Sequence, residues 1–208
     1  GILAQEADKL GAWLVHYSTD YVFDGSGTQS WVESDPTGPL NVYGQTKLEG
    51  EQLIAANCEK HLIFRTSWVY AARGNNFVKT ILRLAEEQES LTVVNDQIGS
   101  PTEAGLLADV TAHAIRHVLS PLRHNSLTPS GIYHVVAGGH ISWHGYARFV
   151  LEAAHKAGLM LKTGPDSVDP IPTSDCLTPA CRPRNSRLDS TLFQNTFGLN
   201  LPHWQSGA

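Results

Sequence analysis

Tyr43 and Lys47 are the residues whose types and spacing most directly indicate chemistry. They stand four positions apart at the start of segment 43–57, which has the apolar periodicity of a helix. Positions i and i+4 share one helix face, so the Lys47 ammonium is expected near the Tyr43 phenol, where it favours the ionised form. Two charges about 4 Å apart at an effective dielectric near 20 interact by roughly 4 kcal/mol, enough to move the pKa of a tyrosine toward neutral pH. The pair therefore predicts a tyrosine that donates a proton.

A second polar group, Ser18, Thr19 and Asp20, directly follows an apolar run at 12–17 that is typical of a buried parallel strand. Ligands of parallel sheets bind beyond the carboxyl ends of the strands. The Thr19 hydroxyl is therefore expected to bond a substrate carbonyl oxygen while negative charge develops there during hydride addition. Tyr-x-x-x-Lys alone also occurs on solvated helix faces, but the strand and the long polar loop before it favour a catalytic site.

Alternating strands and helices must position these residues. Strand patterns cover 12–17, 61–66, 91–94 and 131–137. Helical patterns cover 1–11, 43–57, a segment that begins after Asn75 or Asn76 as its cap, 102–119 with Thr102 as its cap, 142–158 and 191–197. In the first of these helices, the predicted apolar face consists of Ile2, Leu3, Ala7 and Leu10. Between the last two helices, the proline-containing segment 162–184 predicts irregular structure or short edge strands. This order indicates an α/β fold, a mostly parallel sheet flanked by helices with a smaller lobe beside it.

Composition narrows the classes of partner. The 208 residues carry a formal net charge of -5, which argues against nucleic acid. No run approaches the length of a membrane span and no signal peptide is visible, so no membrane partner is predicted. Cys58, Cys176 and Cys181 form no CxxC pair and fit reduced thiols, which favours a cytoplasmic location. The i,i+4 pairs His113/His117 and His140/His144 lack the further ligands of a zinc site, so no metal site is predicted.

Five segments carry a family resemblance. They are HYSTDYVFDG (16–25), YGQTKLEGE (43–51), RTSWVY (65–70), DQIGSPT (96–102) and CRPRNSRLD (181–189). In this order and over almost the whole chain, the sequence resembles the extended short-chain dehydrogenase/reductase family. The resemblance implies a partial Rossmann-like sheet, with residues 1–130 forming the C-terminal part of a dinucleotide-binding domain and residues 131–208 mainly a substrate-binding lobe that interleaves with it.

The resemblance also implies an activity, that of an NAD(P)H-dependent oxidoreductase of nucleotide-sugar biosynthesis. NADPH would deliver hydride to C4 of a dTDP-4-keto-6-deoxyhexose, giving dTDP-L-rhamnose, and Tyr43 would protonate the C4 oxygen. Lys47 would lower the pKa of Tyr43 and hold the nicotinamide ribose, so both residues would also bind the cofactor. Thr19 would complete the catalytic triad, and Asp20 and Trp68 would contact the sugar nucleotide, although ordinary core packing is an equal alternative for Trp68.

Further substrate contacts are expected in the C-terminal segment of the chain. Arg182 and Asn185, with Arg184 and Arg187, are expected to contact the substrate, because guanidinium groups suit a pyrophosphate; solvated surface charge is the alternative. NADH stays open as a second hydride donor. Family members use Mg²⁺ held by acidic residues between subunits, but no ligand set is assigned here, and a homodimer is one oligomeric state that the sequence leaves open.

Two other functions stay open. A dinucleotide-binding regulatory subunit, as in the beta subunit of methionine adenosyltransferase, shares this fold without being a known reductase. The other is an NAD-dependent sugar-nucleotide epimerase or dehydratase of the same extended family. Net NADPH oxidation with dTDP-4-keto-rhamnose separates the reductase from both, because epimerases regenerate their cofactor.

The chain departs from the family at its start. A member opens with a strand and a glycine-rich turn that holds the cofactor pyrophosphate at a helix N-terminus. Here Gly25-Ser-Gly27 lies in the long polar loop and predicts only a turn, and PHWQSGA ends where the family continues into a helix. We therefore expect a fragment that lacks roughly 80 to 90 residues before Gly1, about three βα units.

The 208-residue chain alone is expected to bind NADPH weakly or not at all, because the turn that would hold the pyrophosphate is missing from it. Isothermal calorimetry with the isolated chain measures this. A submicromolar dissociation constant would contradict the expectation.

Overall fold

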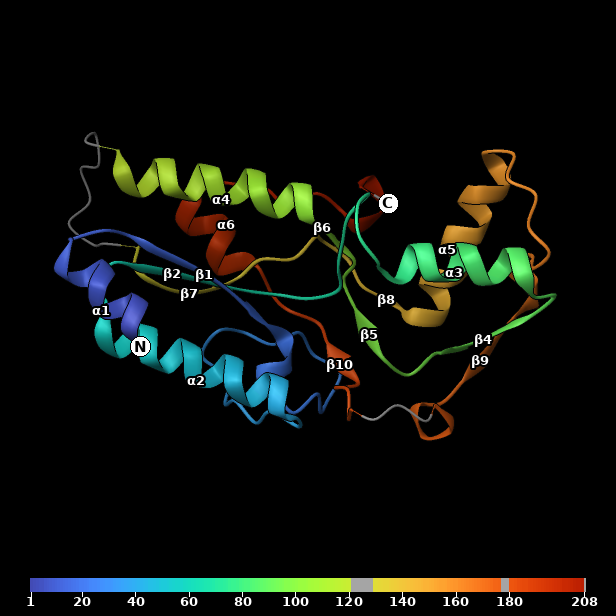
Figure 1. Ribbon diagram of the computed structural model, residues 1–208, viewed down its shortest axis with the longest axis horizontal. Coiled ribbons are helices and arrows are strands. Elements are labelled where there is room, and N and C mark those ends of the chain that lie inside the picture. The colour runs from blue at the N-terminus through green and yellow to red at the C-terminus, as the bar shows by residue number, and fades with distance from the viewer. Residues whose placement is uncertain (121–128, 177–179, 208) are drawn as a thin grey trace.

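The computed structural model describes residues 1–120, 129–176 and 180–207. Its first part is a parallel sheet in the order β1-β2-β7, with α1 and α2 on one face and α4 and α6 on the other (Figure 1). These elements are β1 (Leu14–Thr19), β2 (His61–Thr66), β7 (Gly131–His134), α1 (Ile2–Lys9), α2 (Val42–Asn57), α4 (Ala104–Leu119) and α6 (Thr191–Phe197). Helices on both faces bury the sheet, which explains why its strands read as continuous apolar runs.

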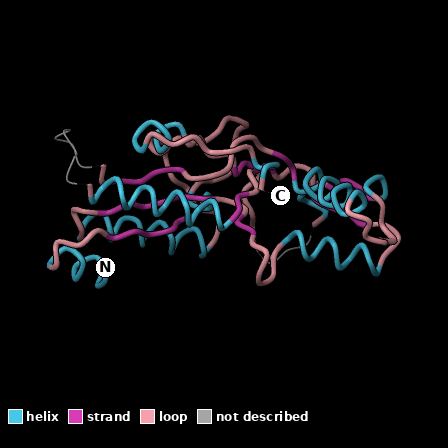
Figure 2. Tube along the Cα trace, turned by 90° about the horizontal axis from the view of Figure 1, so that it is seen from above, coloured by secondary structure: helices cyan, strands magenta, loops and turns pink. Residues whose placement is uncertain are grey.

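The second part lies beside the first along the long axis of the molecule (Figure 2). It contains α3 (Phe77–Glu87), α5 (Trp143–Lys156), the parallel pair β4 (Leu91–Val94) and β9 (Val168–Ile171), and the small sheet β10 (Asn185–Ser186), β5 (Ile98–Gly99) and β8 (Ile141–Ser142). The pair β3 (Val69–Tyr70) and β6 (Thr102–Glu103) and the short 3-10 helices η1 (Asp20–Val22), η2 (Pro165–Ser167), η3 (Thr173–Asp175) and η4 (Trp204–Ser206) complete the fold. Each part therefore draws elements from both sides of residue 130.

Side-chain caps begin three of the helices. Asn41, Asn76 and Ser142 accept hydrogen bonds from the backbone N–H groups of Gly44, Lys79 and Gly145, which fixes the starts of α2, α3 and α5. For α2 this sets the first turn, which carries Tyr43. None of the helices in the described part is long and apolar enough to cross a membrane.

Most predicted elements are confirmed. β2, β4 and α6 have the predicted bounds, Asn76 caps α3 as one of the two expected residues, and 168–171 is a short strand in the proline-containing segment. β1 begins and ends two residues later than predicted, at Leu14 and Thr19, so Ser18 and Thr19 are its last residues rather than the residues after it. β7 ends at His134 rather than at residue 137. Residues 121–128, in the predicted connection 120–130, and residues 177–179 lie outside the described residues.

Two predictions about helices are wrong. Thr102 does not cap α4, because it belongs to β6, where its hydroxyl donates to the Ser100 carbonyl at 3.0 Å and accepts from the Ala137 N–H at 3.2 Å. The predicted apolar face of α1 is wrong except at Ala7, which packs against the core: Ile2 is 78% exposed and Leu10 is 81% exposed, whereas Ala4 is buried. Short-range periodicity did not reveal which side of α1 meets α2.

A buried ion pair attaches α2 to the sheet. Arg65 of β2 donates from Nε to Glu51 Oε1 at 3.0 Å and from Nη2 to Glu51 Oε2 at 2.6 Å. Both side chains are at most 4% exposed, and the Arg65 guanidinium also lies 5.1 Å from the centre of the Phe23 ring. A paired guanidinium and carboxylate are tolerated in a core only while both are present.

Glu51→Gln is expected to lower the free energy of unfolding by about 3–5 kcal/mol, because it leaves the Arg65 charge buried without its counter-ion. The matched control is Glu87→Gln, which removes one partner of the exposed Arg83–Glu87 pair and should cost under about 1 kcal/mol. Urea unfolding of both variants measures the difference. Equal losses would show that the buried pair is not a special constraint.

Candidate active site

A cavity of about 330 Å³ opens where β1 and β2 end. The parallel register pairs Thr19 with Thr66, so the residues after both strands emerge at the same edge of the sheet. The cavity is lined by residues 18–21, Tyr43, residues 66–69 and Trp143. It therefore brings together four of the predicted site residues, Thr19, Asp20, Tyr43 and Trp68.

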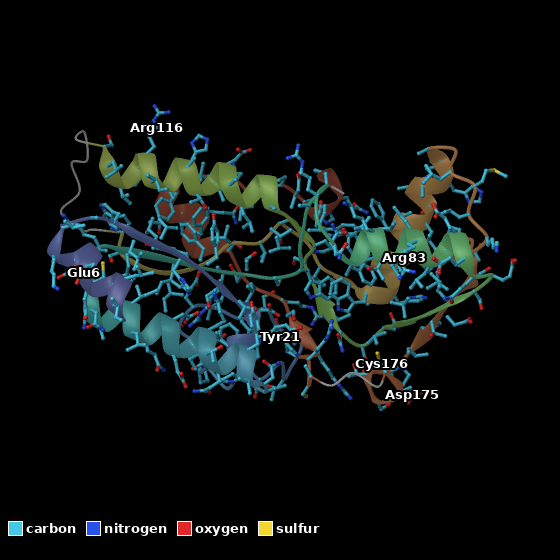
Figure 3. The ribbon with its side chains drawn as sticks, viewed as in Figure 1. Glu6, Tyr21, Arg83, Arg116, Asp175 and Cys176 are labelled. Atoms are coloured by element: carbon cyan, nitrogen blue, oxygen red, sulfur yellow. The ribbon has the colours of Figure 1, made fainter. Side chains whose placement is uncertain are left out.

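Tyr43 lies at the mouth of this cavity on the first turn of α2. Its side chain is 54% exposed, and its ring packs edge-on against Tyr21 with centroids 5.6 Å apart. Gly44 permits this approach, because a Cβ there would lie 2.2 Å from the Tyr21 carbonyl oxygen. Tyr21 itself lies beside the end of α2 that is nearer the second part (Figure 3). Within the described residues nothing bonds the Tyr43 hydroxyl, which leaves it available to a ligand.

Lys47 is anchored to β1. Its ammonium donates to the Tyr17 carbonyl oxygen and lies 3.4 Å from His16 Nε2. Burial lowers the pKa of Lys47, and the Glu51 carboxylate one turn further along α2 acts in the opposite direction. The pKa of His16 is also lowered, by the burial of its own ring and by the Lys47 charge. The predicted effect of Lys47 on the pKa of Tyr43 stays a prediction.

The polar floor of the cavity is formed by Ser18, Thr19, Asp20 and Thr66. Thr19 Oγ1 donates to Asp20 Oδ1 at 3.0 Å and accepts from the Tyr21 N–H at 3.2 Å. Asp20 is 2% exposed, and this burial raises its pKa to about 6, while the hydroxyls of Ser186 and Thr19 partly offset the rise. A ligand that donates a hydrogen bond to this carboxylate would favour its ionised form and lower its pKa.

Three polar atoms of the floor are buried without a hydrogen-bond partner among the described residues: Ser18 Oγ, Asp20 Oδ2 and Thr66 Oγ1. Buried polar groups are normally paired, so unpaired ones in a cavity wall indicate a polar ligand or ordered water. The floor therefore fits a molecule rich in hydroxyl and carbonyl groups, such as a sugar.

Sequence reasoning missed several lining residues: Tyr21, Thr66, Ser67 and Trp143. A signal existed for Thr66 and Ser67, because Thr66 ends a predicted strand and Ser67 directly follows it. Trp143 had no local signal, because it comes from α5 in the second part and meets the cavity only through the tertiary fold.

The remaining predicted substrate residues lie elsewhere. Arg182 is exposed and lines a second cavity of about 480 Å³ between α3, β4 and the segment around Cys176. Asn185 is 2% exposed, and its amide donates to the carbonyl oxygens of Ser26 at 3.1 Å and Gln29 at 2.8 Å. Asn185 therefore fastens the loop after η1 to the C-terminal segment, and its contact with substrate stays a prediction.

The same loop needs a glycine at position 25. Its φ is +71°, and a Cβ there would lie 2.5 Å from Pro183 Cβ.

The other two predicted arginines have partners within the protein. Arg184 lies 3.6 Å from Asp96, and Arg187 donates to Asn185 Oδ1 at 2.9 Å. In the part of the chain that the structure describes, no group of three His, Cys, Asp or Glu residues is placed to hold a metal ion.

The helix-flanked parallel sheet with Thr19, Tyr43 and Lys47 at one edge defines the class of the fold, a Rossmann-like domain of the extended short-chain dehydrogenase/reductase type. A family model described as "RmlD substrate binding domain" matches residues 1–208, and the chain belongs to this family. The dTDP-4-dehydrorhamnose reductases of Shigella flexneri and Salmonella typhimurium are 55% and 56% identical to it over 205 residues.

A solved structure agrees with these relatives. The crystal structure of dTDP-4-dehydrorhamnose reductase from Bacillus anthracis in complex with NADP matches with a TM-score of 0.84 at 35% identity, over 99% of this chain and 66% of that one. The alignments with the Shigella and Salmonella proteins likewise cover 99% of this chain and 66% of each relative. The chain thus spans just under two thirds of the length of these three proteins.

Asp20→Asn is expected to stabilise the protein above pH 6 and to leave its stability unchanged near pH 4. Because the pKa of Asp20 is raised to about 6, the folded state binds this proton more tightly than the unfolded state, and stability falls as pH rises from about 4 to 6. Above that range the ionised carboxylate costs about 3 kcal/mol, which asparagine avoids.

Urea unfolding of the wild type and of Asp20→Asn at pH 4 and pH 7.5 measures the effect. A difference between the two proteins that does not depend on pH would contradict it.

Proposed function

We propose that this protein reduces the C4 keto group of dTDP-4-dehydro-L-rhamnose to give dTDP-L-rhamnose, with NADPH as the hydride donor. One observation carries the proposal: Thr19 and Tyr43, which come from separate elements, line one cavity with the Trp68 indole at the carboxyl ends of the strands. This is where parallel sheets bind ligands. The names of the relatives and the NADP in the Bacillus anthracis structure support the choice of substrate and cofactor.

Lys47 does not line the cavity itself, but it follows Tyr43 by one turn on α2 and fits a bound nicotinamide ribose. Lys47 has three N–H donors, and within the described residues its partners are the Tyr17 carbonyl and His16, which leaves a donor for a ribose hydroxyl. When bound, NADPH supplies the hydride to C4. The exposed Tyr43 hydroxyl would then transfer its proton to the C4 oxygen, and the nearby ammonium would stabilise the phenolate that is left.

Thr19 would bond the same oxygen from the floor of the cavity. Its hydroxyl proton points to Asp20 Oδ1 in the structure, so substrate would have to compete for it. If Asp20 is protonated, its carboxyl no longer competes fully for that proton, and Thr19 is free to donate to the substrate oxygen. Because burial raises the pKa of Asp20 to about 6, this pair couples substrate binding to pH in the weakly acidic range.

The nucleotide would extend toward the second cavity. That cavity is lined by apolar residues of α3 and β4 together with Arg182, and it shares Trp143 with the first cavity. An apolar pocket suits a pyrimidine ring, and a guanidinium at its rim suits the pyrophosphate. This arrangement supports a sugar linked to a nucleoside diphosphate over a free sugar.

The proposed location is the cytoplasm, consistent with Cys58, Cys176 and Cys181 as free thiols. Mg²⁺ and a homodimer are not part of the proposal. A regulatory dinucleotide-binding subunit would not oxidise NADPH in the presence of the keto sugar, and an epimerase would show no net oxidation.

Tyr43→Phe is expected to lower kcat by about 10²- to 10⁴-fold while NADPH affinity stays within about threefold, because only the proton donor is removed. The assay follows NADPH absorbance with dTDP-4-dehydro-L-rhamnose, using protein expressed from its full reading frame.

The control for this substitution is Tyr70→Phe, which also removes one phenol but lies outside the cavity, in β3. Undiminished turnover in Tyr43→Phe would remove Tyr43 from the mechanism. Absence of NADPH oxidation by the wild type would overturn the proposed reductase.

A further inference from the structure

The indoles of Trp68 and Trp143 are stacked face to face. Their ring centroids are 3.5 Å apart and their planes differ by 10°. Trp68 follows β2 in the first part of the molecule, whereas Trp143 is the first residue of α5 in the second part. Both rings line the 330 Å³ cavity, so the stack joins the two parts at the wall of the site.

Trp143 is held in place by its own neighbours. The Phe77 ring of α3 lies 4.4 Å from it and the Tyr146 ring of α5 lies 6.4 Å from it, both as centroid distances. Trp143 also lines the second, apolar cavity, which Trp68 does not. Its position is therefore set by the core of the second part and is shared by the two cavities.

Trp68, in contrast, is in a conformation that needs support. Its φ is +49°, and it is the one residue other than glycine with a positive φ in the described ranges. For a bulky side chain this region is uncommon and persists only where the surroundings impose it. Gly99 leaves the space that the indole occupies, because a Cβ there would lie 2.6 Å from Trp68 Cε2.

We propose that Trp143 is a positioning residue that acts through this stack to hold the Trp68 indole over the sugar ring of the substrate. The identity of that sugar rests on the proposed function. Aromatic pairs contribute enough beyond their burial to change an equilibrium by roughly three- to tenfold, which sets the size of the expected effect. Loss of the Trp143 ring should weaken binding of the sugar nucleotide more than it slows the chemical step.

The test uses Trp143→Leu and the conservative Trp143→Phe, in protein expressed from the full reading frame. Trp143→Leu should raise KM for dTDP-4-dehydro-L-rhamnose and the calorimetric Kd for dTDP-rhamnose roughly three- to tenfold, with kcat and the KM for NADPH changed less than about twofold. Trp143→Phe, which keeps an aromatic ring, should recover most of the loss.

A spectroscopic signature checks the stack itself. Two indoles this close give an exciton couplet in circular dichroism, which should be present in the wild type and absent from both Trp143 variants. Phe149→Leu is the matched control, because Phe149 lies on the same helix but packs on Trp204, 4.8 Å away between ring centroids, outside both cavities. This variant should keep the couplet and the wild-type KM.

Gly99→Ala provides a second route that leaves Trp143 intact. The added methyl group would lie 2.6 Å from Trp68 Cε2 and would displace the indole, so it should raise the same KM and Kd. If the Trp143 variants do not fold, this variant alone decides: unchanged KM and Kd values would overturn the proposal.

The outcomes separate this proposal from the proposed function. No couplet in the wild type, or a lost couplet with unchanged KM and Kd, would overturn the role of Trp143 while the reductase stands. If the wild type binds dTDP-rhamnose but shows no turnover, and binding weakens in Trp143→Leu, the reductase is overturned and the role of Trp143 is supported. Neither turnover nor binding in the wild type would overturn both.

Discussion

The attachment of α2 to β2 through Glu51 and Arg65 is the constraint on which the site depends. Glu51 lies on the same helix as Tyr43 and Lys47, and Arg65 immediately precedes Thr66 on the strand that ends at the cavity. A bidentate pair buried on both sides permits little sliding of the helix along the sheet, because displacement would expose each charge to an apolar core. The exposed phenol and the buried floor are thereby kept in one fixed relation.

The site itself divides into two electrostatic regions. The floor formed by Ser18, Thr19, Asp20 and Thr66 is buried, and there burial raises the pKa of Asp20 to about 6. The mouth, where Tyr43 lies, is half exposed, and the bond from Lys47 to the Tyr17 carbonyl holds the same helix against β1. A phenol and a hydroxyl thus face one cavity from opposite environments, and the proposed protonation of the C4 oxygen would use both groups.

Much of the local structure was predictable because it depends on local physics. Apolar runs placed β2 and β4 at their observed bounds, and a capping asparagine marked the start of α3. Prediction failed where distant contacts outweigh local preference. Thr102 has the side chain of a helix cap, but it pairs in β6 because β3 lies beside it. Ile2 and Leu10 are exposed because Ala4 and Ala7 are the residues of α1 that meet the core.

The sequence by itself determined which side chains are candidates for catalysis. They are a phenol and an ammonium one helical turn apart, Tyr43 and Lys47, and the Thr19 hydroxyl at the end of a strand. These follow from side-chain type and from the periods of helix and strand, which are properties of neighbouring residues. Only the tertiary structure decided that Trp143 joins Trp68 in the wall, that Asn185 fastens a loop, and that Asp20 is buried. Such facts depend on which surfaces pack together, and packing is set by the shape of the whole core rather than by any one segment.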